Sequence, residues 1–135
     1  MASQLKVDTI TGVTTAGSVV VTGEAGSTTT HFQQGLTKVW HNFDGESTVA
    51  TRDSYNVSGL TDNGTGDYTS AFTNNMVNND YSSAVGADSA SGHLGLIYSD
   101  AQTATSSFRS YVVEIYSSAA TDSDVVVFQS AGDLA

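Results

Sequence analysis

The chain has 135 residues, which fits one domain with a modest core. Its 14 acidic and 4 basic residues give a formal charge of −10, so nucleic acid and anionic membrane surfaces would repel it. The sequence has no cysteine, which excludes disulfides and thiolate metal sites, and no apolar run reaches the roughly 18 residues of a membrane span. We therefore expect no nucleic-acid partner and no membrane insertion, and the lack of a signal peptide predicts synthesis in the cytoplasm.

Residues 1–30 predict an extended arm that precedes the folded body. Short apolar islands stand among Gly, Ser and Thr, and they offer too little surface to offset the cost of ordering the backbone, roughly 1–2 kcal/mol per residue. Alternation over residues 5–8 predicts one short strand in the arm. We expect the arm to anchor the chain on another protein surface, and the alternative is a disordered tail. The candidate anchoring residues are Leu5, Val7, Ile10, Val19 and Val21.

The folded body is predicted to begin with one helical turn at most, because Thr30 and Gln33 have the spacing of a capping box and Gly35 can end the turn. Residues 39–44 then alternate between apolar and polar side chains, which predicts the first strand of the body. This strand contains Trp40, the sole tryptophan. For Trp40 we favour packing in the core or at a subunit contact over stacking on a ligand.

A β-hairpin is predicted next, over residues 48–72. Residues 48–60 are rich in Thr, Val, Tyr and Ser and alternate imperfectly, and residues 67–72 resume the alternation. Between them, residues 62–66 contain Asp, Asn and two Gly, which suit a turn because Asn and Gly tolerate positive φ. Two such runs around an Asn-Gly turn are typical of a hairpin.

The rest of the chain predicts more short strands separated by polar loops. We expect Met76 to dip from one such loop into the core. Strands are predicted at residues 81–86, 93–98, 107–116 and 125–128. The last of these is apolar on both faces and is expected to be buried on both. The pattern predicts an all-β chain in which residues 31–135 form a β-sandwich or jelly-roll-like body, and a homotrimer would cover the exposed sheet edges.

Candidate catalytic and metal sites are weak in this sequence. His31, His41 and His93 lack the spacing of a zinc site. Residues 62–67 offer oxygen ligands for Ca²⁺, but a turn explains the same residues, and whether this loop binds Ca²⁺ stays open. No serine lies in a Gly-x-Ser-x-Gly motif, and the carboxylates are scattered over turns. We therefore expect no catalytic residues, no metal and no cofactor, and thus no enzyme.

Charged pairs and aromatic residues give further expectations. With few basic residues available, Arg52 and Arg109 are predicted to have fixed acidic partners, and Arg52 with Asp53 is one candidate pair. Tyr68, Tyr81 and Tyr98 are candidate receptor contacts, although strand tyrosines are more often half-buried core residues. The residues expected in the core or at a subunit contact are Trp40, Phe43, Tyr55, Phe72, Phe108 and Phe128.

Residues 38–72, KVWHNFDGESTVATRDSYNVSGLTDNGTGDYTSAF, resemble a module of tail-fibre and fibre-like proteins from tailed phages, especially marine and cyanobacterial ones. The opening LKVDTITGVTTAGSVVVTGE is similar to N-terminal segments of such proteins. The closing VVVFQSAG is a weaker match, since Gln129 stands where the family pattern has Gly. The module brings no catalytic residues with it.

The resemblance implies a non-enzymatic virion structural protein, of fibre or spike type, that lies on the virion surface and contributes to host attachment. It also implies a homotrimer. The alternative is a trimeric capsid decoration or cement protein that stabilises the head. The expected partners are further copies of the chain, other virion proteins bound through the arm, and a glycan or protein of the host surface.

Overall fold

The computed structural model describes residues 5–12, 19–22, 26, 29–32, 35–88, 92–97 and 103–135. The chain divides into two compact units, Met1–Leu36 and Thr37–Ala135. The division therefore falls after Leu36, whereas the sequence predicted it after residue 30. None of the described residues belongs to a helix that is long and apolar enough to cross a bilayer.

The N-terminal unit contains one small antiparallel hairpin. Strand β1 (Val20–Thr22) pairs with β2 (Thr29–His31). After β2, the Gly35 amide donates to the His31 carbonyl at 3.1 Å and closes a hydrogen-bonded turn. The capping box predicted for Thr30 with Gln33 includes a residue outside the described ones, so the helical turn stays a prediction. The short strand predicted at residues 5–8 is wrong, because these residues lie outside any strand.

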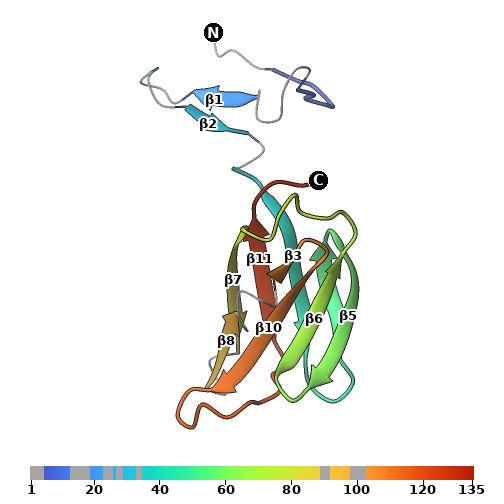
Figure 1. Ribbon diagram of the computed structural model, residues 1–135, viewed down its shortest axis with the longest axis vertical. Coiled ribbons are helices and arrows are strands. Elements are labelled where there is room, and N and C mark those ends of the chain that lie inside the picture. Colours follow the sequence, from blue (N-terminus) through green and yellow to red (C-terminus); the bar gives the residue numbers. More distant parts are fainter. Residues whose placement is uncertain are drawn as a thin grey trace. The chain divides into compact units, whose positions relative to one another are not determined.

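The body consists of two antiparallel sheets (Figure 1). The first sheet has the order β4-β3-β11-β7, and its strands are β3 (Thr37–Asp44), β4 (Ala50–Tyr55), β7 (Ser82–Ala87) and β11 (Val126–Ala131). The second sheet has the order β5-β6-β10-β8, with β9 paired to β10. Its strands are β5 (Val57–Gly64), β6 (Asp67–Phe72), β8 (His93–Ile97), β9 (Thr103–Ala104) and β10 (Ser107–Glu114). The chain is all-β with a β-sandwich-like body, as predicted.

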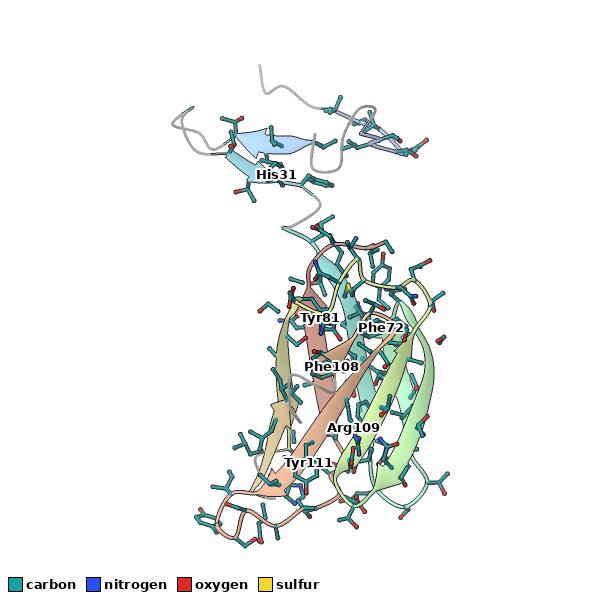
Figure 2. All side chains as sticks on the ribbon, viewed as in Figure 1. His31, Phe72, Tyr81, Phe108, Arg109 and Tyr111 are labelled. Carbon is teal, nitrogen blue, oxygen red and sulfur yellow. The ribbon has the colours of Figure 1, made fainter. Side chains whose placement is uncertain are left out.

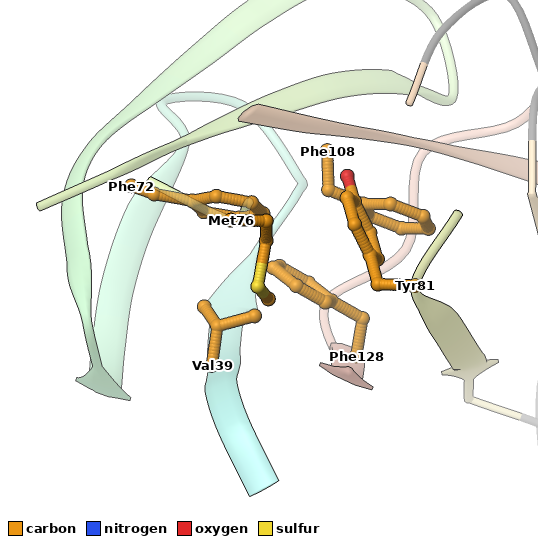
Figure 3. Packing of buried hydrophobic residues seen from close by; sticks show 6 residues of the cluster. All are labelled: Val39, Phe72, Met76, Tyr81, Phe108 and Phe128. Carbon is orange, nitrogen blue, oxygen red and sulfur yellow. The ribbon is translucent and has the colours of Figure 1, made fainter. Parts of the chain in front are cut away.

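The core lies between the inner faces of the two sheets. In one cluster, Val39 and Phe128 of the first sheet pack with Phe72 and Phe108 of the second, and Met76 enters from its loop as predicted (Figure 3). The rings of Phe108 and Phe128 are stacked across the sandwich, with centroids 4.8 Å apart. A second cluster is made of Phe43, Tyr68, Val112 and Val126. The strands alternate because each must present one face to this core.

The predicted hairpin is confirmed between β5 and β6, with positive φ at Gly64 (130°) and Gly66 (69°). However, residues 48–60 form two strands rather than one. The chain leaves the first sheet after β4 and enters the second at β5 through Asn56 alone, which adopts φ 61°. Its side-chain amide donates to the carbonyls of Lys38 and Asn74. Asparagine tolerates this left-handed conformation. Because residue types keep alternating through Asn56, the sequence does not show that one strand ends and another begins there.

At the opposite edge, β7 and β8 carry the chain from the first sheet to the second. A Cβ atom at Gly95 would lie 2.8 Å from the carbonyl carbon of Gly86, so the two strands approach closely only because position 95 has no side chain. In the neighbouring strand β11, Val126 and Phe128 are buried but Val127 is 38% exposed. The prediction that this strand is buried on both faces is wrong, because the first sheet leaves one face uncovered.

Candidate functional site

The candidate site lies on the outer face of the first sheet. Residues directly opposite each other in an antiparallel pair point to the same side of the sheet. Trp40 of β3 pairs with Tyr55 of β4 and Gln129 of β11, and Gln129 pairs with Ala84 of β7. In the next row, Asn42 pairs with Asp53 and Val127, and Val127 pairs with Gly86. We call this surface the outer face; it comprises Trp40, Asn42, Asp53, Tyr55, Ala84, Gly86, Val127 and Gln129.

A hollow of about 450 Å³ lies on this face, across β3, β11 and β7. Its outward-pointing lining consists of Trp40, Asn42, Ala84, Gly86, Val127 and Gln129. None of the described residues of the second sheet lines it, so it lies outside the core. Small residues on β7 make the space: a Cβ atom at Gly86 would lie 3.2 Å from the nearest methyl group of Val127. A second depression, of about 160 Å³, adjoins it and is lined in part by Thr37, Ser82 and Gln129.

The hollow combines apolar surface with amide groups. Trp40 is half-buried, Val127 is 38% exposed and Gln129 is exposed. The Oδ1 atom of Asn42 is buried and accepts no hydrogen bond from any residue that the structure describes. Buried side-chain acceptors are nearly always paired, so this oxygen is an unusual feature of the lining.

His41 supports this strand from the core side. Its Nδ1 atom lies 2.8 Å from the Ser70 hydroxyl of the second sheet, and its Nε2 atom lies 2.8 Å from the Thr51 hydroxyl of β4. Burial lowers the pKa of His41 to about 4, so the ring is neutral at pH 7. A neutral ring has one donor and one acceptor nitrogen, which two hydroxyl groups satisfy. His41 therefore links the two sheets, and its buried ring is not available to a ligand.

The residues predicted for the core divide into two groups. Phe43, Phe72, Phe108 and Phe128 are buried, as expected. Trp40 is half-buried on the outer face, and Tyr55 beside it is 53% exposed. These two residues lie outside the core, so only the subunit-contact interpretation of them stays a prediction. Their position was missed because Val39, His41 and Phe43 look no more apolar in sequence than Trp40.

Two of the three candidate receptor tyrosines are core residues. The Tyr68 hydroxyl donates to the Gly45 carbonyl at 2.8 Å and lies 3.0 Å from the Asp122 carboxylate. Burial, with added repulsion from Asp122, raises the pKa of Tyr68 above its ordinary value. The Tyr81 hydroxyl donates to the backbone carbonyls of Ala104 and Ser107, and burial raises the pKa of Tyr81 to about 12. Both are therefore core residues, the alternative that the sequence favoured, and neither is a receptor contact; Tyr98 lies outside the described residues.

The outer side of the second sheet carries a charged pair. Arg109 and Tyr111 lie on β10 (Figure 2), and the Arg109 guanidinium binds both carboxylate oxygens of Asp67, with an Nε to Oδ1 distance of 2.6 Å. The acidic partner predicted for Arg109 is thus confirmed. Asp67 is also one of the candidate Ca²⁺ ligands, and its carboxylate is occupied by Arg109. Asp62, the other carboxylate of that loop, accepts the Gly64 amide at 2.9 Å.

The described residues contain no group of three or more His, Asp or Glu that could hold a metal ion. Among the histidines, His41 is buried in the core, whereas His31 lies in the N-terminal unit and His93 begins β8. Arg52 has the acidic partner that was predicted, but it is Asp44, at 3.1 Å, with Asp124 at 4.0 Å. The predicted pair of Arg52 with Asp53 is therefore not the one formed.

The candidate anchoring residues are exposed in the N-terminal unit. Leu5 is 82% exposed, and Val7, Ile10 and Val21 are each more than half exposed. Val19 precedes β1, and its carbonyl accepts the Phe32 amide at 2.8 Å. The N-terminal unit thus leaves most of these apolar side chains uncovered, and their anchoring role stays a prediction.

Neither a family model, nor a curated protein, nor a solved structure matches this chain.

Proposed function

We propose that this protein is a non-enzymatic structural component of a tailed-phage virion, of fibre or spike type, which lies on the virion surface and contributes to host attachment. The resemblance of residues 38–72 to the fibre module supports the proposal. These residues supply nearly all of β3 and the whole of β4, β5 and β6, which are two of the four strands of the first sheet and two of the five of the second.

The observation that carries the proposal is that the two units differ in how far they bury their apolar side chains. The body buries its own core between two sheets. The N-terminal unit, in contrast, leaves Leu5, Val7 and Ile10 exposed to water. Apolar side chains in a short segment gain free energy when a partner surface covers them, at about 25 cal/mol per Å². An N-terminal unit that docks on another virion protein, with a body that faces outward, fits this arrangement.

A homotrimer belongs to the same proposal, since fibre proteins of this type are usually trimeric. The expected mass in solution is three times the 14.0 kDa of the chain. Light scattering coupled to size exclusion measures this mass directly, and a monomer at micromolar concentration would contradict the trimer.

The second candidate function is a capsid decoration or cement protein. The exposed apolar side chains of the N-terminal unit fit a clamp on capsid subunits as well as an anchor on the tail. Position on the particle separates the two functions, because tail proteins and head-decorating proteins differ in number per virion.

The experiment is quantitative mass spectrometry of purified particles of the phage that encodes the chain, with the major capsid protein as reference. A few to a few tens of copies would place the protein on the tail and support host attachment. Hundreds of copies would assign it to the head and favour the cement function. Complete absence from the particles would overturn the proposal.

A further inference from the structure

We propose that the outer face of the first sheet is a glycan-binding site, and that its ligand is a neutral oligosaccharide. The inference rests on the proposed function for the source of the glycan, the host surface, but the binding itself follows from the chemistry of the face. The hollow of about 450 Å³ lies within the range of small-molecule sites, about 300–1,000 Å³.

The first argument is the pairing of two aromatic residues on one exposed surface. Trp40 and Tyr55 are directly opposite each other on β3 and β4, with Tyr55 53% exposed. Residues in this relation have Cβ atoms about 4.5–5.5 Å apart, so their rings share one patch. A sugar ring presents a flat face of C–H groups to such a patch, and a rigid aromatic side chain loses little conformational entropy on binding.

The second argument is the amide chemistry beside the aromatic residues. Asn42 and Gln129 line the hollow, and Asp53 lies directly opposite Asn42. Amides both donate and accept hydrogen bonds, as sugar hydroxyl groups do. The Oδ1 atom of Asn42 is buried beneath this face, so the exposed amide of Gln129 offers the hydrogen-bonding atoms that a sugar hydroxyl group can reach.

The charge of the outer face favours a neutral glycan over an acidic one. The chain carries −10 overall, and the outer face holds Asp53 but none of the four basic residues in its lining. The cations nearest along the strands are engaged: Arg52 binds Asp44, and Lys38 is buried with a partner of its own. An acidic glycan would therefore meet repulsion without a compensating cation, and a neutral one would not.

The same charges disfavour a second copy of the chain on this face. A self-contact through this face would bury Asp53 of both copies with no basic residue in the lining, so the contacts of the proposed trimer would use other surfaces. Cores of protein interfaces are depleted in charged residues, and buried like charges are costly. The small residues Ala84 and Gly86 leave a hollow, whereas a self-complementary face would fill it.

The test measures binding by full-length protein of neutral hexasaccharides of glucose, galactose and N-acetylglucosamine, and of a sialylated oligosaccharide as an acidic comparison, by isothermal titration calorimetry. The same titrations are made with three variants. Trp40→Ala removes the aromatic platform, Gly86→Leu fills the hollow, and Tyr116→Ala removes an aromatic residue that is 92% exposed elsewhere.

We expect at least one neutral hexasaccharide to bind and the acidic one not to bind. Trp40→Ala and Gly86→Leu should each weaken binding by about ten-fold or more, and Tyr116→Ala should leave it unchanged. Retained thermal unfolding transitions show that the variants fold. Equal affinities of Trp40→Ala and Tyr116→Ala would overturn the proposal, as would no binding of any neutral probe at millimolar concentration. A Trp40→Ala variant that loses self-association instead would assign the face to a second copy.

The two proposals fail separately. If no glycan binds while the copy number locates the protein on the tail, the glycan site is wrong and the attachment function stands. If neutral glycans bind but the particles lack the protein, the site stands and the virion function is wrong.

Discussion

Alternate residues of strand β3 have different roles, one set on its inner face and the other on its outer face. Val39, His41 and Phe43 point into the sandwich and are at most 1% exposed. Trp40 and Asn42 point outward and line the hollow. Because a strand alternates its side chains with a period of two, one segment can hold the fold together and present a binding surface at the same time. Substitutions on the inner face should therefore change stability, and substitutions on the outer face should change binding.

The largest expected effect is the loss of a core aromatic residue. Phe43 is fully buried and packs against Tyr68, with ring centroids 5.2 Å apart. Phe43→Ala should lower the free energy of unfolding by about 3–5 kcal/mol, because it removes buried surface and leaves a cavity. Denaturant titration measures this loss, with Phe43→Leu as a milder variant if the alanine variant does not fold. Trp40→Ala is the matched outer-face change, and a loss as large as that of Phe43→Ala would break the comparison.

A smaller effect is expected at the buried hydroxyl of Tyr68. It donates to the Gly45 carbonyl, and the Asp122 carboxylate lies 3.0 Å away. Tyr68→Phe should cost about 1–3 kcal/mol, because the buried Gly45 carbonyl loses the hydroxyl group that donates to it. On the exposed side, Tyr55→Phe should change the free energy of unfolding by under about 0.5 kcal/mol. If Tyr68→Phe lowered the free energy of unfolding by as little as Tyr55→Phe, the hydrogen bonding of Tyr68 would contribute nothing to stability.

The inner face should also respond to pH through His41. Its pKa is lowered to about 4 in the folded chain from about 6.5 in an unfolded one, so the unfolded state binds more protons between these values. Stability is therefore full above pH 6.5 and falls as the pH drops towards 4. Between pH 7 and pH 5, His41 alone should cost about 2 kcal/mol. His41→Gln should lack this component, and an identical pH dependence in both proteins would contradict the assignment.

The smallest expected effect lies at the ion pair of Arg52 with Asp44. Both side chains are about one third exposed, 39% and 34%, and water screens their attraction. Arg52→Ala should lower the free energy of unfolding by under about 1 kcal/mol, and 1 M NaCl should remove most of the difference. A loss above 2 kcal/mol that salt does not change would show that Arg52 contributes through packing rather than charge.

Much of the fold could be predicted from the sequence. Alternation located β3, β6, β7, β8 and β10, and turn residues located the hairpin of β5 and β6. The break at Asn56 could not be predicted, because residue types alternate through it while the backbone changes sheets. The exposed face of β11 was missed as well, since Val127 fits equally well in a strand that is buried on both sides.

The candidate site was not visible in the sequence for a related reason. Its residues come from strands separated by up to some 90 positions, and only the register of β3 with β11 and of β11 with β7 brings them together. The sequence predicts Trp40 in the core or at a subunit contact and does not indicate which of the two applies. The one available signal was parity: Trp40 lies on the opposite side of β3 from Val39, His41 and Phe43.

The most direct test of the glycan-binding face is the fluorescence of Trp40, because this is the only tryptophan in the chain and its emission reports on the hollow alone. The protein would be titrated with the neutral hexasaccharides, with Gly86→Leu as the control. The account predicts a saturable change of emission in the unmodified protein and none in Gly86→Leu. An emission that stays constant while calorimetry detects binding would place the ligand elsewhere and contradict the account.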